Sequence, residues 1–217
     1  MHVYALLHRS AIALPLPEGV DAPLDGVVWE DVAAIVEPQL TLEALQADDV
    51  RLLQAVLAHD RVIRELFAQT TVLPLRFTSF PTEPDLLADL QANQHTYLAT
   101  LERLQDKAEY VVKGLPREYV PPTLDATLKG RDYFLAKKQQ YQSQTEYQIA
   151  QTQEWDVIRT AIAQHFAIVE LPDTQQLCLL GDRHGQSQLQ SEVQTLQSHL
   201  RTWDLQLGEP LPPFHFV

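Results

Sequence analysis

The sequence predicts an α+β protein of two domains, an N-terminal α+β domain over residues 1–107 and a C-terminal domain over residues 108–217. Three observations lead to this prediction. Short β-prone runs alternate with amphipathic helical stretches along the chain. From residue 109 onward the order of expected elements is β-α-β-β-α-β, the order of a ferredoxin-like domain. Residues 123–166 contain one glycine and no proline, which predicts a long extended helix in the second domain.

The first domain has recognisable strand, helix and cap signals. Pro74 lacks an amide proton, so its strand is expected either to lie at a sheet edge or to begin irregularly. Thr82 and Asp85 have the spacing of a capping box, which predicts the start of a helix. The expected elements are a strand at 2–7, two short strands or one broken strand at 27–29 and 32–36, a helical turn at 41–47, a helix from Leu52 to Phe67 capped by Asp48 or Asp49, a strand at 72–77, and a helix from Leu87 to Leu104 with a leucine seam.

The second domain contains one long helical stretch whose middle, Lys137–Gln153, is almost wholly polar. This pattern fits either one continuous helix or two helices that meet at a glutamine-rich bend. The polar middle is expected to be exposed and dispensable for folding. The other expected elements are strands at 109–115, 167–171, 176–180 and 203–207, a helix from Leu189 to Leu200 with a capping box at Ser187 and Gln190, and a C-terminal FHFV that pairs back on a sheet.

The net charge of −13 excludes nucleic acid as a partner, because phosphates would repel this surface. Residues 1–107 carry 16 acidic and 7 basic side chains, a net −9, and they favour a cationic or an uncharged apolar partner. The single cysteine, Cys178, excludes an internal disulfide and a cysteine-based zinc site. No run is long and apolar enough to predict a membrane helix, and no signal peptide is recognisable, so a cytoplasmic protein is expected.

The sequence lacks the standard motifs of catalysis and nucleotide binding. It contains no phosphate-binding GxxxxGK[ST], no GxGxxG, no GxSxG and no HExxH. Its eight histidines are scattered, and no two have a metal-binding helical spacing. We therefore expect no enzyme activity, no cofactor and no metal.

Four polar residues near the first long helix form the one candidate site, His59, Asp60, Arg64 and Arg76. Asp60 falls on the apolar stripe that Leu52, Leu53, Val56, Leu57, Ile63, Leu66 and Phe67 define, which predicts a buried carboxylate. A buried carboxylate needs a partner, and Arg64 or Arg76 is expected to pair with it. The four residues are interpreted either as a structural ion-pair cluster or as a catalytic or ligand-binding cluster.

Three segments of the chain resemble the gas vesicle protein F/L family. They are HDRVIRELF followed by TTVLPLRF (residues 59–67 and 70–77), Gly130–Phe134 at the start of the long helix, and the terminal GEPLPPFHFV. The typical glycine after LPLRF is Thr78 here, which affects the expected exit of the strand. The resemblance implies an accessory or minor structural protein of gas vesicles.

Two hypotheses about function follow. In the first, which the resemblance implies, the chain binds the hydrophobic shell protein, gas vesicle protein A, together with other gas vesicle accessory proteins. It would limit aggregation of the shell protein during nucleation, and residues 1–107 would carry the binding surface through their sheet edge and leucine seam. In the second, the chain is a small-molecule sensor or enzyme that uses Asp60, Arg64 and Arg76. The missing catalytic motifs and the resemblance both favour the first hypothesis.

Overall fold

The structure is a computed structural model that describes residues 1–41, 49–125, 127–172 and 174–217. The chain divides into two compact units. Unit 1 consists of residues 1–109, 180–184 and 210–217, and unit 2 of residues 110–179 and 185–209. Unit 1 thus includes two segments that the sequence analysis placed in residues 108–217. The helical turn expected at 41–47 lies almost wholly outside the described residues.

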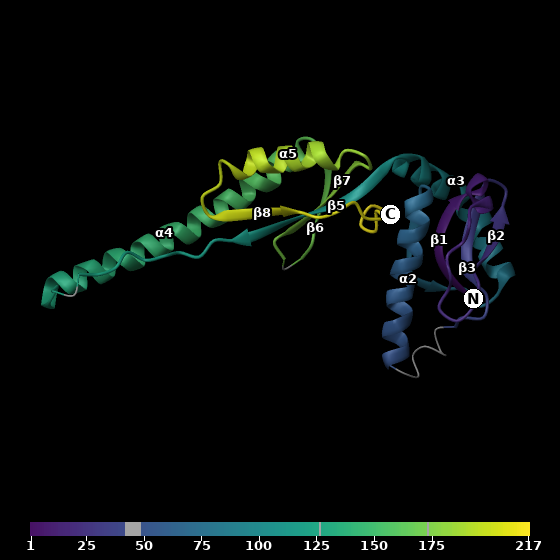
Figure 1. The fold of residues 1–217 in the computed structure, drawn as a ribbon, viewed down its shortest axis with the longest axis horizontal. Helices are drawn as coiled ribbons and strands as arrows, with labels where there is room; N and C mark the ends of the chain where they lie inside the picture. Colours follow the sequence, from purple (N-terminus) through teal and green to yellow (C-terminus); the bar gives the residue numbers. More distant parts are fainter. Residues whose placement is uncertain (42–48, 126, 173) are drawn as a thin grey trace. The chain divides into compact units, whose positions relative to one another are not determined.

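Unit 1 is built on a four-stranded antiparallel sheet with strand order β2-β3-β1-β4 (Figure 1). A bulge between Val3 and Ala5 shifts the register of β1 against both of its neighbours. The elements of this unit are β1 (His2–His8), the 3-10 helix η1 (Arg9–Ala13), β2 (Asp25–Trp29), β3 (Val32–Glu37), α2 (Asp49–Gln69), β4 (Leu73–Ser79) and α3 (Glu83–Leu104).

Two sequence predictions about this sheet and its helices are confirmed. The strand that contains Pro74, β4, lies at the edge of the sheet. Helix α3 is capped as the capping box predicts, because the Asp85 amide donates to Thr82 Oγ1 at 3.3 Å and Thr82 Oγ1 donates to Asp85 Oδ2 at 2.6 Å. The region 27–36 forms two strands rather than one broken strand, and Glu30 between them adopts a positive φ of 46°.

The leucine seam of α3 forms the core of unit 1 instead of a surface for a partner. Leu86, Leu90 and Leu101 are buried against the sheet residues Val3, Leu6, Val27, Val32, Ala34, Val36 and Leu73. Leu87 and Tyr97 also pack against this cluster. The seam is therefore unavailable to another protein, contrary to the expectation from the sequence.

The four strands of the second sheet have the order β6-β7-β5-β8. Its elements are β5 (Lys107–Pro116), α4 (Gly130–Ala163), β6 (Ala167–Glu170), β7 (Gln176–Asp182), α5 (Gln186–Gln197) and β8 (Trp203–Leu207). Helix α4 is one continuous helix of 34 residues, so the alternative of two helices at a bend is wrong. Helix α5 begins after Gly185 without a side-chain cap, so the capping box expected at Ser187 is wrong as well.

Unit 2 is held together by two tryptophans on α4 and β8. Trp155 packs on Gly114 of β5, where an added Cβ would lie 2.4 Å from the indole ring. Trp203 lies 5.0 Å from Trp155 between ring centroids, and its indole N–H donates to the Gln151 carbonyl at 2.7 Å. Because β5 carries a glycine at this point, the indole can approach the backbone closely.

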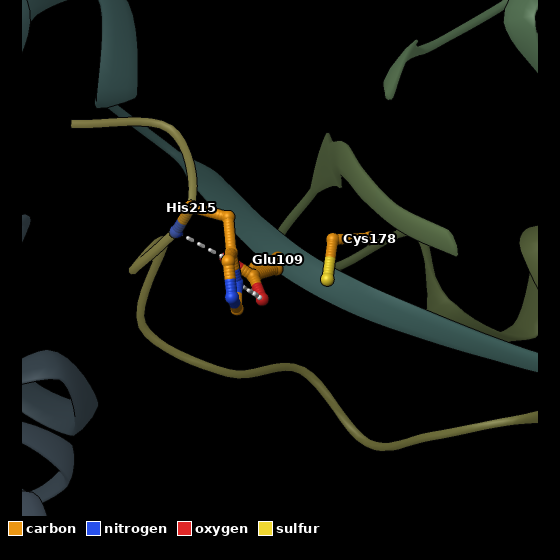
Figure 2. Close-up of side chains that lie close together, drawn as sticks. All are labelled: Glu109, Cys178 and His215. Carbon is orange, nitrogen blue, oxygen red and sulfur yellow. Dashed lines mark hydrogen bonds and ion pairs between the residues drawn. The ribbon is translucent and has the colours of Figure 1, made fainter. Parts of the chain in front are cut away.

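Within unit 1, the C-terminal segment is bound by Glu109, a buried residue at the start of β5. The Glu109 and Leu211 backbones exchange two hydrogen bonds, of 2.9 and 2.8 Å. Figure 2 shows His215 against Glu109: its backbone N–H donates to Oε2 at 2.9 Å, and its Nδ1 lies 2.7 Å from Oε1. Arg103 donates to the Phe216 carbonyl. FHFV forms no strand, so its expected pairing on a sheet is wrong, and hydrogen bonds with Glu109 and Arg103 hold it instead.

Candidate functional site

The outward side of α2 carries a stripe of apolar side chains that faces solvent. Leu53 is 60% exposed and Leu57 is 63% exposed, and Val50 and Val56 are exposed too. Val50, Leu53, Leu57, Asp60 and Arg64 follow one another at spacings of three, four, three and four residues, which places them on one side of a helix. We call these five residues, with Val56, the outer face of α2.

The inward side of α2 matches the sequence pattern only in the second half of the helix, where Ile63, Leu66 and Phe67 are buried as predicted. The buried residues of the helix are Ala55, His59, Val62, Ile63, Leu66 and Phe67. Leu52, Leu53, Val56, Leu57, Ile63, Leu66 and Phe67 therefore do not form one buried stripe. A helix with apolar residues on two sides can turn only one of them to the sheet, and here the smaller Ala55 and His59 face inward.

The structure separates the four candidate residues. Asp60 and Arg64 form an ion pair of 2.6 Å on the outer face, where the Asp60 side chain is 44% exposed. The pairing with Arg64 is confirmed, but the expected burial of Asp60 is wrong, because the residue lies on the solvent side of α2. Arg76 is exposed on β4, and no ion pair joins it to Asp60 in the ranges described. His59 points to the opposite side of the helix and is buried.

This placement predicts a small effect for Asp60→Ala. An exposed i,i+4 ion pair stabilises a helix by about 0.3–0.5 kcal/mol, because solvent screens both charges. We expect the free energy of unfolding, measured by urea denaturation, to fall by less than about 1 kcal/mol. Glu65→Ala, which breaks the matching exposed pair with Arg61, is the control and should behave alike. A loss of several kcal/mol for Asp60→Ala alone would contradict the exposed position.

His59 belongs to a buried aromatic group between α2 and the sheet. Its Nδ1 lies 2.8 Å from Nε2 of His2, and its Nε2 lies 3.0 Å from the Leu75 carbonyl. The rings of Tyr4 and Phe77 pack against both imidazoles, with centroids 4.4 to 5.3 Å apart. Burial, together with the neighbouring His59, lowers the pKa of His2 to about 3. Burial also lowers the pKa of His59, so both imidazoles are neutral.

A second buried group, which the sequence analysis missed, surrounds Glu37 at the end of β3. Its Oε2 accepts from the Tyr4 hydroxyl at 2.6 Å and from the Val20 amide at 2.8 Å. Its Oε1 accepts from the amides of Asp21 and Ala22 at 2.7 and 2.8 Å. The carboxylate thereby fixes the loop that leads to β2. The signal in the sequence was a lone acidic residue that continues the apolar strand VAAIV.

Chemically, the site has two layers. The inner layer of His2, Tyr4, Glu37 and His59 is covered and fully hydrogen-bonded, which suits a structural role. The outer face offers an apolar stripe followed by an ion pair, which suits contact with an apolar surface of another protein. Among the helices in the described part of the chain, none combines the length and the apolar character needed to cross a bilayer.

Comparison with known proteins identifies the family. The family model described as gas vesicle synthesis protein GvpL/GvpF matches residues 1–217. No curated protein sequence matches the chain. The crystal structure of GvpF from Anabaena sp. PCC7120 matches with a TM-score of 0.63 at 11% identity, over 99% of this chain and 94% of that one. GvpF from Microcystis aeruginosa matches with a TM-score of 0.61 at 10% identity, over 99% and 97%. The chain belongs to the GvpL/GvpF family of gas vesicle synthesis proteins.

Proposed function

We propose that the chain is an accessory protein of gas vesicle assembly that binds the hydrophobic shell protein, gas vesicle protein A, through the outer face of α2. Its role is to cover an apolar surface of the shell protein and limit aggregation during nucleation. It acts in the cytoplasm at the growing gas vesicle, and other gas vesicle accessory proteins are further partners. It has no catalytic role in this proposal.

The observation that carries the proposal is the exposure of Leu53, Val56 and Leu57 on adjoining turns of one helix. Large apolar side chains that cluster on the surface mark interaction sites, whereas single ones carry little meaning. A helix that presents residues at i, i+3 and i+4 to an apolar groove is a common mode of recognition. The Asp60–Arg64 pair ends the apolar stripe and limits its length along the helix.

The acidic balance of residues 1–107 as a whole supports the proposed role. Residues 1–107 carry a net charge of −9, as 16 acidic and 7 basic side chains. Charge of one sign keeps a protein and the surface that it covers in solution, because the complexes repel one another. An apolar helix face on a strongly acidic body therefore suits a factor that restrains an aggregation-prone partner.

The domain division is part of the same proposal. We propose that residues 108–217 form a ferredoxin-like domain and that residues 1–107 form an N-terminal α+β domain. The element order β5-α4-β6-β7-α5-β8 supports it. Shell-protein binding is assigned to the N-terminal domain, by α2 rather than by the seam of α3.

The test is capture of the shell protein by the full chain carrying Leu53→Asp and Leu57→Asp. Two leucines buried in an interface contribute about 3 kcal/mol together, so capture should fall roughly 100-fold. The matched control is Ala92→Asp with Thr96→Asp, two exposed positions of α3 at the same spacing, and it should capture as the unmodified chain does. Circular dichroism should show that both variants stay folded. Equal capture by the two variants would contradict the proposal.

A further inference from the structure

The last turn of α2, the helix that carries the proposed binding face, brings no basic side chain to its own C-terminal end. None of residues 66–69 is basic, and Thr70 rather than a glycine follows the helix. The last carbonyl groups of a helix lack partners within the helix, and they carry a partial negative charge. Basic side chains or a glycine cap commonly satisfy these groups. The carbonyls at the end of α2 therefore depend on water or on donors from elsewhere in the chain.

Arg183 supplies such donors from a turn more than a hundred residues later in the sequence. Its guanidinium donates to the carbonyls of Phe67 and Thr70. It also lies over the Phe67 ring, with Cζ 4.1 Å from the ring centroid. A positive charge is attracted both to a helix C-terminus and to the face of an aromatic ring, and more strongly where it is partly buried. Arg183 thus holds the C-terminal end of α2 by two hydrogen bonds and a cation–π contact.

The backbone of Arg183 is itself fixed within the same unit. Residues 180–184 belong to unit 1, as α2 does. The Arg183 amide donates to the Asp106 carbonyl at 2.9 Å, and Asp106 lies between α3 and β5. The His184 amide donates to Asp182 Oδ1 at 2.7 Å, which fixes the shape of the turn. The guanidinium is therefore presented to α2 from a fixed point at the junction of α3 and β5.

A small movement at this end of α2 is enlarged at the proposed binding face. Leu53 lies 14 residues before Phe67, which is about 21 Å along a helix. A tilt of about 10° at Phe67 would therefore move Leu53 by about 4 Å. Residues 49–58 are mostly exposed, and most of the buried residues of α2 lie in its second half. The direction of the helix is therefore set mainly at its C-terminal half, where Arg183 contacts it.

We propose that Arg183 is a positioning residue for shell-protein binding, an inference that rests on the proposed function because it concerns the same face. Arg183 holds the C-terminal end of α2 and thereby keeps the outer face of α2 in the position that the partner recognises. It acts through α2 and not by contact with the partner. A helix that occupies its binding position for only part of the time binds more weakly in proportion, because only that fraction is competent.

Distance measurements in the full chain test the position of α2 without any shell protein. Spin labels at Gln54→Cys on α2 and Thr96→Cys on α3, two exposed positions in a Cys178→Ser background, report how α2 lies within unit 1. Arg183→Met removes the charge and the donors but keeps an unbranched side chain. It should broaden the distribution of distances between the labels or shift its mean by up to about 4 Å. An unchanged distribution for Arg183→Met would overturn the inference.

Arg103→Met is the matched control for the loss of a guanidinium. Arg103 donates to the Phe216 carbonyl, also within unit 1, so its replacement should leave the distances between the labels unchanged. Arg183→Lys keeps a positive charge near the Phe67 ring and a donor for the carbonyls, so it should restore the distribution of the unmodified chain. If Arg183 contributed only to overall stability, both methionine variants would give the distribution of the unmodified chain.

Capture of the shell protein by the full chain tests the link to binding. Arg183→Met should bind about 10-fold more weakly, the result expected if α2 occupies its binding position for about a tenth of the time. Arg183→Lys should restore capture, and Arg103→Met should capture as the unmodified chain does. Undiminished capture by Arg183→Met, where Leu53→Asp with Leu57→Asp no longer captures, would overturn the inference and leave the proposed function standing. Undiminished capture by the variant of Leu53 and Leu57 would instead overturn the proposed function, and the role of Arg183 in binding with it.

Discussion

Replacing Glu37 with alanine is expected to lower the free energy of unfolding by roughly 4 kcal/mol, because the buried Tyr4 hydroxyl and three partly buried amides lose their acceptor, and a buried donor without an acceptor costs about 1–3 kcal/mol. The carboxylate accepts four hydrogen bonds, from the Tyr4 hydroxyl and from three successive amides of residues 20–22. Gly19 also packs closely on the carboxylate, because an added Cβ would lie 2.5 Å from Oε2. Urea denaturation followed by circular dichroism measures the loss.

Two further variants separate the hydrogen bonds from the loss of charge and of volume. Glu37→Gln keeps one acceptor oxygen and the shape of the side chain, so it should be less destabilising than Glu37→Ala. Glu102→Ala removes an exposed acidic residue of α3 and should change the free energy of unfolding by less than about 0.5 kcal/mol. If Glu37→Ala unfolds at the same urea concentration as Glu102→Ala, the hydrogen bonds to Glu37 do not hold the loop.

Lowering the pH below 6.5 is expected to destabilise the fold through the His2–His59 pair. Burial, together with the nearby His59, lowers the pKa of His2 from 6.5 to about 3 in the folded chain. Above pH 6.5 the imidazole is neutral in both states and contributes no pH dependence. Below pH 6.5 the unfolded chain binds a proton that the folded chain does not, so stability falls with pH down to about pH 3. His2 alone should cost about 2 kcal/mol at pH 5.

His59 acts in the same direction, because burial lowers its pKa as well, although the nearby Asp60 and the hydrogen bond to Leu75 oppose the shift. The measurement is the free energy of unfolding at pH 7, 6 and 5. His2→Phe should flatten this pH dependence by about 1.4 kcal/mol per pH unit below pH 6. His95→Phe, at an exposed position of α3, should keep the slope of the unmodified chain. A His2→Phe variant with an unchanged slope would show that His2 is already protonated in the folded state.

Local signals in the sequence predicted much of the fold. Thr82 and Asp85 predict the start of α3, because the capping hydrogen bonds join residues only three positions apart in the sequence. Pro74 indicates an edge strand, because it has no amide proton to donate to a neighbouring strand. The uninterrupted run after Gly130 predicts helical structure, but its polar middle left one helix or two open, and the structure shows one helix up to Ala163.

The same reasoning failed where two sides of one helix compete. Apolar residues occur on both sides of α2, and periodicity does not state which side the sheet covers. The sheet covers Ala55 and His59. On that side the imidazole of His59 hydrogen-bonds to His2 and to the Leu75 carbonyl. Leu53 and Leu57 are left outside, and Asp60 with them.

Contacts between residues distant in sequence were also beyond prediction from local patterns. Glu37 binds amides of residues 20–22, and Glu109 binds His215, more than a hundred residues away. A buried carboxylate needs such donors, but its position in the sequence does not name them. The roles of both carboxylates could therefore be recognised only from the structure.

The most direct test of the central claim, that the outer face of α2 binds the shell protein, is photo-cross-linking from single positions of the full chain. A benzophenone side chain placed at Leu57 should cross-link to gas vesicle protein A during its assembly, because that residue lies in the proposed interface. The same side chain at Thr96, exposed on α3, should give no product. A cross-link to the shell protein from Thr96 and none from Leu57 would contradict the account.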